Sequence, residues 1–346
     1  MIKILLLLIL VVYTAFGFES FNYVNKKYKI TQSSELEKIY TTEISPYYDR
    51  VKLHYFLGEE ALKIAYKIFL VPNAKANIVI SSGRTEGMFK YKELIYDLNR
   101  NGYSVYIYDH RGQGYSGRMA KDSQLGHIDN FMNYVEDMKT FFNDYVNKDR
   151  KVFLLAHSMG GAIASLYIEK YIYDFDGVVL TSPMHQPDLI SARLTKMVCT
   201  LIKKRESNRD KYIFGEVSYD DSEAIFNKNK LTHSKIRFDL TLREYEQNPE
   251  LKIGGPSVKW VSEACEWSHN SVEMAENIQI PVLLMQAAKD TIVNLKPQEE
   301  FCRTTLGFCK GIKIDGAYHE LLVEEDEIRN RAMSAMFDFF KLHTKD

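Results

Sequence analysis

The chain has 346 residues, of which 45% are hydrophobic and 26% are charged. This composition is ordinary for a globular protein and excludes a chain that is disordered throughout, and the length allows one large domain or two smaller ones. Lys and Arg total 45 against 46 Asp and Glu, so the chain lacks the basic excess of most nucleic-acid binders and we expect no nucleic-acid partner.

The first element is an uncharged, mostly apolar stretch over residues 4–18, which follows Lys3. A short positive region, an apolar stretch and small residues such as Ala15 and Gly17 are typical of a secretory signal peptide. A membrane anchor is the alternative, although about 20 apolar residues are needed to span a bilayer. We therefore predict a signal peptide (or membrane anchor) over residues 1–17. The protein is then exported, periplasmic or extracellular, with association with the membrane surface left open.

The next segments predict a sheet with helices between its strands. Residues 18–50 form a polar lead-in segment without an assigned structure, and alternating residues over 52–71 predict an antiparallel hairpin. Short apolar runs typical of buried parallel strands follow at 77–80, 104–108, 152–155, 178–180 and 282–285. Stretches with helical apolar spacing lie at 91–98, 131–146, 162–171 and 327–342. This alternation predicts an α/β fold with a mostly parallel, doubly wound sheet.

The alternation is interrupted between about residues 183 and 271, where the chain is polar and rich in Lys, Asn and Glu. We interpret this segment as a mainly helical cap inserted over the strand ends. The core then comprises residues 51–182 and 272–346, and the cap residues 183–271. Apolar residues between 194 and 202 either line a tunnel for a substrate or only pack the cap onto the core.

A serine lies between a predicted strand and a predicted helix. The strand over 152–155 runs into residues 156–161, Ala-His-Ser-Met-Gly-Gly, which match the small-x-Ser-x-Gly pattern of a nucleophile elbow. Ala156 replaces the more usual glycine and adds one methyl group. Such a turn places the hydroxyl of Ser158 at a helix N-terminus, where the N–H of Met159 can donate to a developing oxyanion. Ser158 is therefore the candidate nucleophile.

An activated serine needs a general base, and the base needs a carboxylate that orients it. Asp290 lies in the loop after the strand at 282–285, and His319 lies in the loop after a predicted strand at 311–314. The carboxyl ends of parallel strands meet at one edge of a sheet. We therefore expect Ser158, Asp290 and His319 to meet as a catalytic triad.

Other residues compete for two of these roles. Asp315 is the alternative acid, although it lies only four residues before His319 in the same loop. His233, His269 and His343 are the alternative bases, and a surface or core role is the default for each. The loop position of His319 after a predicted strand favours it over all three.

The second oxyanion donor is expected in the loop after the strand at 77–80. Gly83 lets the chain turn there, and the N–H of Arg84 would be the donor. The side chains of Arg84 and Glu86 either pair to hold this loop or are solvated surface charges. A glycine-rich turn over 109–117 lacks the spacing of either phosphate-binding motif, so we interpret it as a structural turn that braces the sheet.

Export would permit disulfides among the four cysteines, and Cys302 with Cys309 is a plausible local pair. The sequence has no C-x-x-C motif and no close cluster of His and Cys, so no metal site is predicted.

Together these motifs resemble the monoglyceride lipase and lysophospholipase branch of the α/β hydrolases, from about residue 28 to the C-terminus. The matching stretches are 82–86, 109–117, 157–161 and 316–322, with 229–234 and 254–260 in the cap. The resemblance implies an α/β-hydrolase fold with Ser158, Asp290 and His319 as the triad and Arg84 and Met159 as oxyanion donors. It also implies cleavage of one acyl ester of a lysophospholipid or monoacylglycerol, without a cofactor.

Two kinds of alternative remain. A carboxylesterase, thioesterase or peptidase would use the same scaffold, because this fold does not determine the substrate. A non-catalytic lipid-binding module would need none of the three triad residues. The sequence sets no oligomeric state.

Overall fold

The computed structural model describes residues 17–187, 199, 201–202 and 209–344. Residues 1–16 of the predicted signal peptide and most of the apolar stretch at 194–202 lie outside these residues. No helix among the described residues is both long and apolar enough to cross a membrane.

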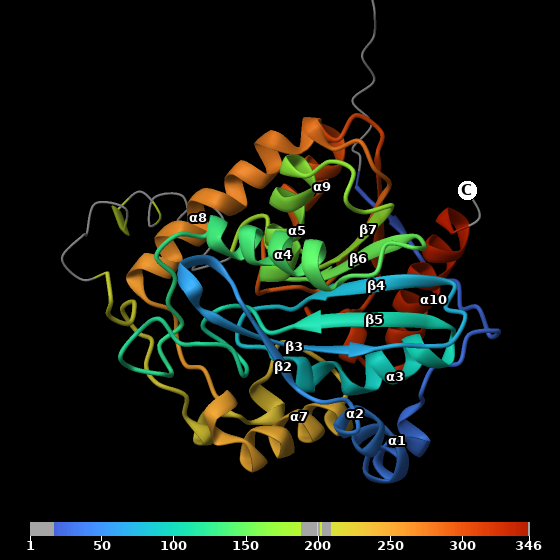
Figure 1. Cartoon of the computed structure of the whole chain (residues 1–346), viewed down its shortest axis with the longest axis horizontal. Coiled ribbons are helices and arrows are strands. Elements are labelled where there is room, and N and C mark those ends of the chain that lie inside the picture. Colours follow the sequence, from blue (N-terminus) through green and yellow to red (C-terminus); the bar gives the residue numbers. More distant parts are fainter. Residues whose placement is uncertain (1–16, 188–198, 200, 203–208, 345–346) are drawn as a thin grey trace, which may run out of the picture.

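Within the described residues, one mixed sheet runs through the molecule in the order β1-β9-β8-β7-β6-β4-β5-β3-β2 (Figure 1). The predicted hairpin is confirmed as β2 and β3, which pair antiparallel, and β3 is also antiparallel to β5. The other neighbours pair in parallel. The strands are β1 (Glu19–Ser20), β2 (His54–Leu57), β3 (Lys63–Phe69), β4 (Ala76–Ser81), β5 (Tyr103–Tyr108), β6 (Val152–His157), β7 (Gly177–Thr181), β8 (Val282–Ala287) and β9 (Cys309–Ile314).

Helices cover both faces of this sheet (Figure 1). The α-helices are α1 (Ser33–Ile39), α2 (Ser45–Asp49), α3 (Lys92–Arg100), α4 (Met132–Tyr145), α5 (Met159–Lys170), α7 (Lys235–Gln247), α8 (Val258–Glu273), α9 (Leu295–Thr304) and α10 (Asp326–His343). A π-helix, η1 (Tyr40–Ile44), joins α1 to α2. The short 3-10 helices are η2 (Glu59–Ala61), η3 (Met88–Tyr91), η5 (Asp221–Glu223), η6 (Phe226–Lys228), η7 (Pro249–Leu251), η8 (Met274–Asn277) and η9 (Leu321–Val323).

Each face of the sheet carries its own hydrophobic core. In β6, Leu154 and Ala156 pack with α4, α5 and α8 in one core, whereas Phe153 and Leu155 pack with α3 and α10 in the other. This follows from the alternation of side chains along a strand. The doubly wound, mostly parallel sheet predicted from the sequence is therefore confirmed.

The predicted cap contributes α7 and α8, which lie on opposite sides of the sheet (Figure 1). Trp260, Val261 and Ala264 of α8 are buried in the core that also contains α5. Helix α7 instead lies beside α1 and η3. The boundaries expected for the cap stay a prediction, and α8 continues past the expected end at residue 271.

The lead-in segment, for which the sequence predicts no structure, is packed onto the core. Strand β1 pairs in parallel with β9 at the edge of the sheet. Leu36 and Ile44 are fully buried against Leu240 of α7. The lead-in segment therefore connects the sheet edge to the cap.

Candidate active site

Ser158 occupies a strained turn between β6 and α5. Its backbone has φ 53° and ψ −119°, a conformation that side chains other than glycine rarely adopt unless surrounding contacts enforce it. The N–H of Ser158 donates to the carbonyl of Thr181 (3.1 Å), and its own carbonyl accepts the N–H groups of Gly161 and Met184 (2.9 Å each). The turn is therefore held through the backbone.

The two glycines after Ser158 allow close packing against neighbouring strands. A Cβ on Gly160 would overlap the carbonyl oxygens of Ser81 and Ser82 at the end of β4. A Cβ on Gly161 would lie 2.6 Å from the Cβ of Pro183. Both positions require glycine because backbone and a proline ring occupy the space. Ala156 is buried in β6, so the extra methyl group is accommodated.

The structure brings the three predicted triad residues into one hydrogen-bonded row. His319 Nε2 lies 2.9 Å from Ser158 Oγ, and His319 Nδ1 lies 2.6 Å from Asp290 Oδ2. Asp290 Oδ1 accepts the N–H groups of Ile292 (2.8 Å) and Val293 (3.2 Å). Both carboxylate oxygens therefore have partners, and one of them faces the imidazole as an orienting acid must.

The competing residues lie elsewhere. The carbonyl of Asp315 accepts a hydrogen bond from Arg331 (3.0 Å), whereas Asp290 is the acid hydrogen-bonded to His319. His269 is exposed and pairs with Glu273, and His233 pairs with Glu324. The ring of His343 packs against Phe339.

The loop that carries Arg84 lies beside the nucleophile because β4 and β6 are paired neighbours, with Ser81 opposite Ala156. We call residues 82–86 the oxyanion loop. The Gln113 amide donates to the carbonyls of Gly83 and Glu86 (2.7 Å each). The glycine-rich turn at 109–117 therefore braces this loop.

Neither expectation for the side chains of Arg84 and Glu86 is correct. Arg84 donates to the carbonyl of Gly254 (3.2 Å) and its guanidinium lies 5.3 Å from the Trp260 ring centroid. Glu86 is buried and pairs with Lys90 at 2.8 Å. The two side chains neither pair with each other nor lie in solvent, because Arg84 bonds to the distant Gly254 and Glu86 bonds to Lys90, four residues away.

A buried group of charges adjoins the triad. The Lys90 ammonium forms ion pairs with both Glu86 and Glu320. Burial alone would raise the pKa of Glu86, but Lys90, His157 and Tyr91 outweigh it and lower that pKa to about 2. Burial would lower the pKa of Lys90, yet Glu320 and Glu86 raise it overall. The group therefore contains a permanent cation between the two carboxyl groups.

His157 completes this group beside the triad. Its ring centroid lies 4.8 Å from that of His319, and its Nδ1 lies 3.1 Å from the carbonyl oxygen of Thr181. Burial lowers its pKa to about 4, although Glu86 opposes this effect, so the ring is neutral at pH 7. Glu86, His157 and Glu320 are close enough to ligate a metal ion, but the ammonium of Lys90 already pairs with both carboxylates.

The loop that carries His319 is held by contacts that the sequence did not suggest. We call residues 315–325 the histidine loop. The fully buried Glu324 carboxylate accepts the N–H of Tyr318 (2.7 Å) and both the N–H (2.9 Å) and Nδ1 (2.8 Å) of His233. The His233 ring also stacks on Tyr318, with centroids 3.7 Å apart. The cap is thus joined to the residue that precedes His319.

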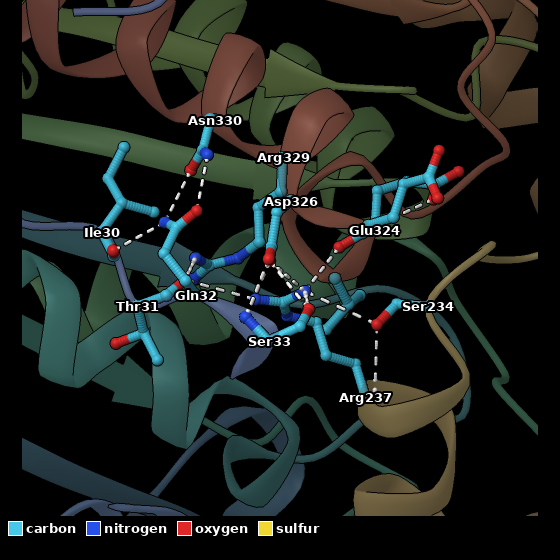
Figure 2. A network of polar contacts seen from close by, with 12 residues as sticks. Ile30, Thr31, Gln32, Ser33, Ser234, Arg237, Glu324, Asp326, Arg329 and Asn330 are labelled. Atoms are coloured by element: carbon cyan, nitrogen blue, oxygen red, sulfur yellow. Dashed lines mark hydrogen bonds and ion pairs between the residues drawn. The ribbon is translucent and has the colours of Figure 1, made fainter. Parts of the chain in front are cut away.

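Figure 2 shows a second network, which joins the cap to the lead-in segment. Arg237 of α7 donates to the carbonyl of Glu324 (2.9 Å) and to the carboxylate of Asp326 (3.0 Å). Asp326 also accepts the N–H and the hydroxyl of Ser33. Arg329 pairs with Asp97 at 2.8 Å. These long-range pairs carry no sequence signal, because their members come from separate segments.

A cavity of about 510 Å³ opens over Ser158 and His319. Its walls come from the oxyanion loop, from α7 and from the segment at 224–232. Apolar side chains in the lining include Ile225, Leu231, Phe238, Leu242, Tyr245, Ile292 and Val323. The exposed side chains of Lys228 and Lys230 also line it. The cavity thus offers an apolar surface with charges at the base and on the cap side, as small-molecule sites commonly do.

Two disulfides are present within the described residues. Cys302 and Cys309 pair, with Cα atoms 4.9 Å apart, as the local spacing predicted. Cys199 and Cys265 also pair, across 66 residues, and join an early part of the cap to α8 near the end of the cap.

Comparison with known proteins gives consistent results. The family model described as "Serine aminopeptidase, S33" matches residues 72–326. The chain is 35% identical over 297 residues to lysophospholipase L2 of Escherichia coli strain K12, covering 83% of this chain and 87% of that protein. It is 26% identical over 263 residues to monoglyceride lipase of Rattus norvegicus, covering 75% and 80%.

A solved structure gives the same fold. The crystal structure of the monoacylglycerol lipase of Paleococcus ferrophilus superposes with a TM-score of 0.63 at 19% identity, covering 84% of this chain and 99% of that one. The α/β-hydrolase fold predicted from the sequence is confirmed.

Proposed function

The chain belongs to the serine aminopeptidase S33 family of α/β hydrolases, in its lysophospholipase and monoglyceride lipase branch, and on that premise we propose that it cleaves the single acyl ester of a lysophospholipid or monoacylglycerol. The observation that carries the proposal is the row Ser158–His319–Asp290, with distances of 2.9 and 2.6 Å, beneath an apolar-lined cavity.

The proposed mechanism is acyl transfer in two steps. His319 takes the proton of Ser158 as Oγ attacks the ester carbonyl, and Asp290 stabilises the imidazolium that forms. The N–H groups of Arg84 and Met159 donate to the oxyanion of the tetrahedral intermediate, and a donor of this kind contributes roughly 3–4 kcal/mol. The leaving alcohol takes the proton from His319. Water, activated by the same imidazole, then releases the fatty acid, and no step needs a cofactor.

The family description names an aminopeptidase, so a peptide substrate is the alternative to consider. Recognition of a free amino terminus calls for a carboxylate that is not already paired. The two carboxylates that line the described cavity, Glu86 and Glu320, are both paired with Lys90. The apolar side chains of the cavity instead suit an acyl chain. This arrangement favours a lipid ester over a peptide.

We further propose that the protein acts in an exported, oxidising compartment. The disulfides Cys199–Cys265 and Cys302–Cys309 support this placement, because disulfides persist outside the reducing cytosol. The apolar stretch after Lys3 supports it independently.

A substrate panel on wild type and Ser158→Ala tests the proposed function. The panel holds lysophosphatidylcholine, monoacylglycerol, p-nitrophenyl esters and aminoacyl-naphthylamides. We expect the lipid esters to have the highest kcat/KM and Ser158→Ala to lose at least about a thousandfold in kcat. Equal or better turnover of the aminoacyl-naphthylamides would contradict the lipid assignment, and an active Ser158→Ala would contradict the mechanism.

A further inference from the structure

Lys90 lies in η3, outside the triad, with its ammonium between two loops of the active site. It pairs with Glu86 at the end of the oxyanion loop and with Glu320 in the histidine loop. The side chains of Lys90, Glu86 and Glu320 are only 10%, 7% and 8% exposed, respectively. An ion pair this deep is screened little by solvent, so its geometry strongly affects the two loops.

Each carboxylate partner is attached to catalytic backbone. Glu86 accepts the N–H of Gly83, the residue before the proposed donor Arg84, at 2.6 Å, and the hydroxyl of Tyr91 at the same distance. Glu320 follows His319 directly in the chain. Its N–H donates to the carbonyl of Leu231 in the cap at 2.9 Å. A shift of either carboxylate would therefore move a proposed oxyanion donor or the general base.

We propose that Lys90 is a positioning residue, whose ammonium ties the oxyanion loop to the histidine loop and so sets the distance between the oxyanion donors and His319. This inference rests on the proposed serine-hydrolase function but not on which ester is the substrate. Lys90 acts through Glu86 and Glu320 and takes no part in proton transfer.

Removing the ammonium would leave two carboxylates facing each other in a buried site. Two such groups cannot both be ionised cheaply, so they share one proton and the loss of that proton is shifted to higher pH. At low pH the shared proton replaces the ammonium as the bridge. At high pH both groups are charged and repel, and the two loops separate. Lys90→Met should therefore lose activity as the pH rises, over a range where wild type does not.

Other titratable or charged groups also lie near His319 and the two carboxylates. They are Asp290 from the loop after β8, His157 from β6, Tyr91 from η3, Arg84 from the oxyanion loop, and Tyr219, Lys228, Lys230, Arg237 and Tyr245 across the cavity. Only Glu86 and Glu320 become an unbridged pair of like charges when Lys90 is replaced.

The test measures kcat and KM for a soluble p-nitrophenyl ester from pH 6 to pH 9. The variants are Lys90→Met, Lys90→Arg and the double variant Lys90→Met/Glu320→Gln. We expect Lys90→Met to lose at least about tenfold in kcat across this range beyond any loss in wild type, with KM within about twofold. Lys90→Arg should retain most of the activity. The double variant should be free of the added pH dependence, because the amide that replaces the Glu320 carboxylate carries no charge.

Lys92→Met is the matched control. Lys92 is equally buried and pairs with Glu244 at 2.6 Å, but it does not line the catalytic cavity. This variant should melt at a lower temperature and keep the pH profile of wild type. A loss of kcat in Lys90→Met that is the same at every pH, or that Glu320→Gln does not relieve, would overturn the inference.

If Lys90→Met does not fold, Glu320→Gln alone weakens the contact between Lys90 and the histidine loop. We then expect a kcat several-fold below wild type with unchanged KM. An unchanged kcat would overturn the inference. Ser158→Ala is assayed in parallel. Activity in Ser158→Ala would refute the proposed function, whereas an inactive Ser158→Ala beside a wild-type-like Lys90→Met would refute only the role of Lys90.

Discussion

The turn that carries Ser158 and the loop that carries His319 meet where Ser158 Oγ lies 2.9 Å from His319 Nε2. Different kinds of contact hold the turn and the loop in place. The turn is held by backbone hydrogen bonds and by Gly160 packed against the carbonyls that end β4. The histidine loop is held by buried charged side chains, Glu320 paired with Lys90 and Glu324 bonded to His233. One side of the site is therefore built from close packing and the other from ion pairs.

This difference has consequences for the kinds of change that each side tolerates. Close packing of backbone fails when volume is added, because nothing nearby can move aside. Buried ion pairs fail when one partner loses its charge, because the other is left unpaired. Added volume should therefore damage the packed side, and a removed charge should damage the charged side.

The largest effect is expected from Asp290→Asn, which keeps the shape of the acid and removes its charge. The amide can no longer hold the Nδ1 proton of His319, so the imidazole adopts the wrong tautomer. Loss of this contact in a comparable triad lowers kcat by about 10⁴, and we expect a similar loss here. Asp315→Asn is the control and should stay within about twofold of wild type. Steady-state kinetics on a soluble ester decide between the two acids.

Gly160→Ala tests the packed side. The added Cβ would overlap the carbonyl oxygens of Ser81 and Ser82, so the turn must move and displace both Ser158 and the oxyanion loop. We expect kcat to fall by about a hundredfold and the free energy of unfolding by about 1–3 kcal/mol. Ala156→Gly makes the opposite change in the same turn and should leave kcat within about twofold. A fully active Gly160→Ala would show that packing does not hold the turn.

Glu324→Gln tests the charged side. The neutral amide has one acceptor oxygen, whereas the carboxylate accepts from Tyr318, His233 and Glu325. We expect the free energy of unfolding to fall by about 1–3 kcal/mol and kcat by about tenfold, because Tyr318 precedes His319. Chemical denaturation and kinetics on one preparation measure both. Lower stability with unchanged kcat would mean that Glu324 supports the fold alone.

Lys230→Ala tests a third kind of contact, an exposed charge on the cap side of the cavity. An exposed ion pair contributes about 0.2–1 kcal/mol. We therefore expect kcat/KM for a lysophosphatidylglycerol to fall up to about fivefold, and kcat/KM for the monoacylglycerol with the same chain to stay unchanged. Added salt should remove the difference. An equal loss on both substrates would mean that Lys230 does not contact the phosphate.

The sequence predicted the parts of the fold and site whose residues lie close together along the chain. The strand–turn–helix around Ser158, and the strand ends before Asp290 and His319, could be identified because each signal is local. The pairing of Lys90 with Glu320 and the bond from His233 to Glu324 could not, because their members are far apart in the sequence and meet only through tertiary packing. For the same reason the sequence predicts no structure for the lead-in segment. In the folded protein, Ser33 of this segment bonds to Asp326 and Thr31 bonds to Asp97.

The most direct test of the central claim is labelling of the intact protein with a fluorophosphonate, followed by mass spectrometry of its peptides. Ser158 should carry one adduct, because His319 and Asp290 activate that hydroxyl alone. Labelling should disappear in Asp290→Asn on the time scale at which wild type reacts fully. An adduct on another residue, or no adduct on a folded protein, would contradict the claim that these three side chains form a working triad.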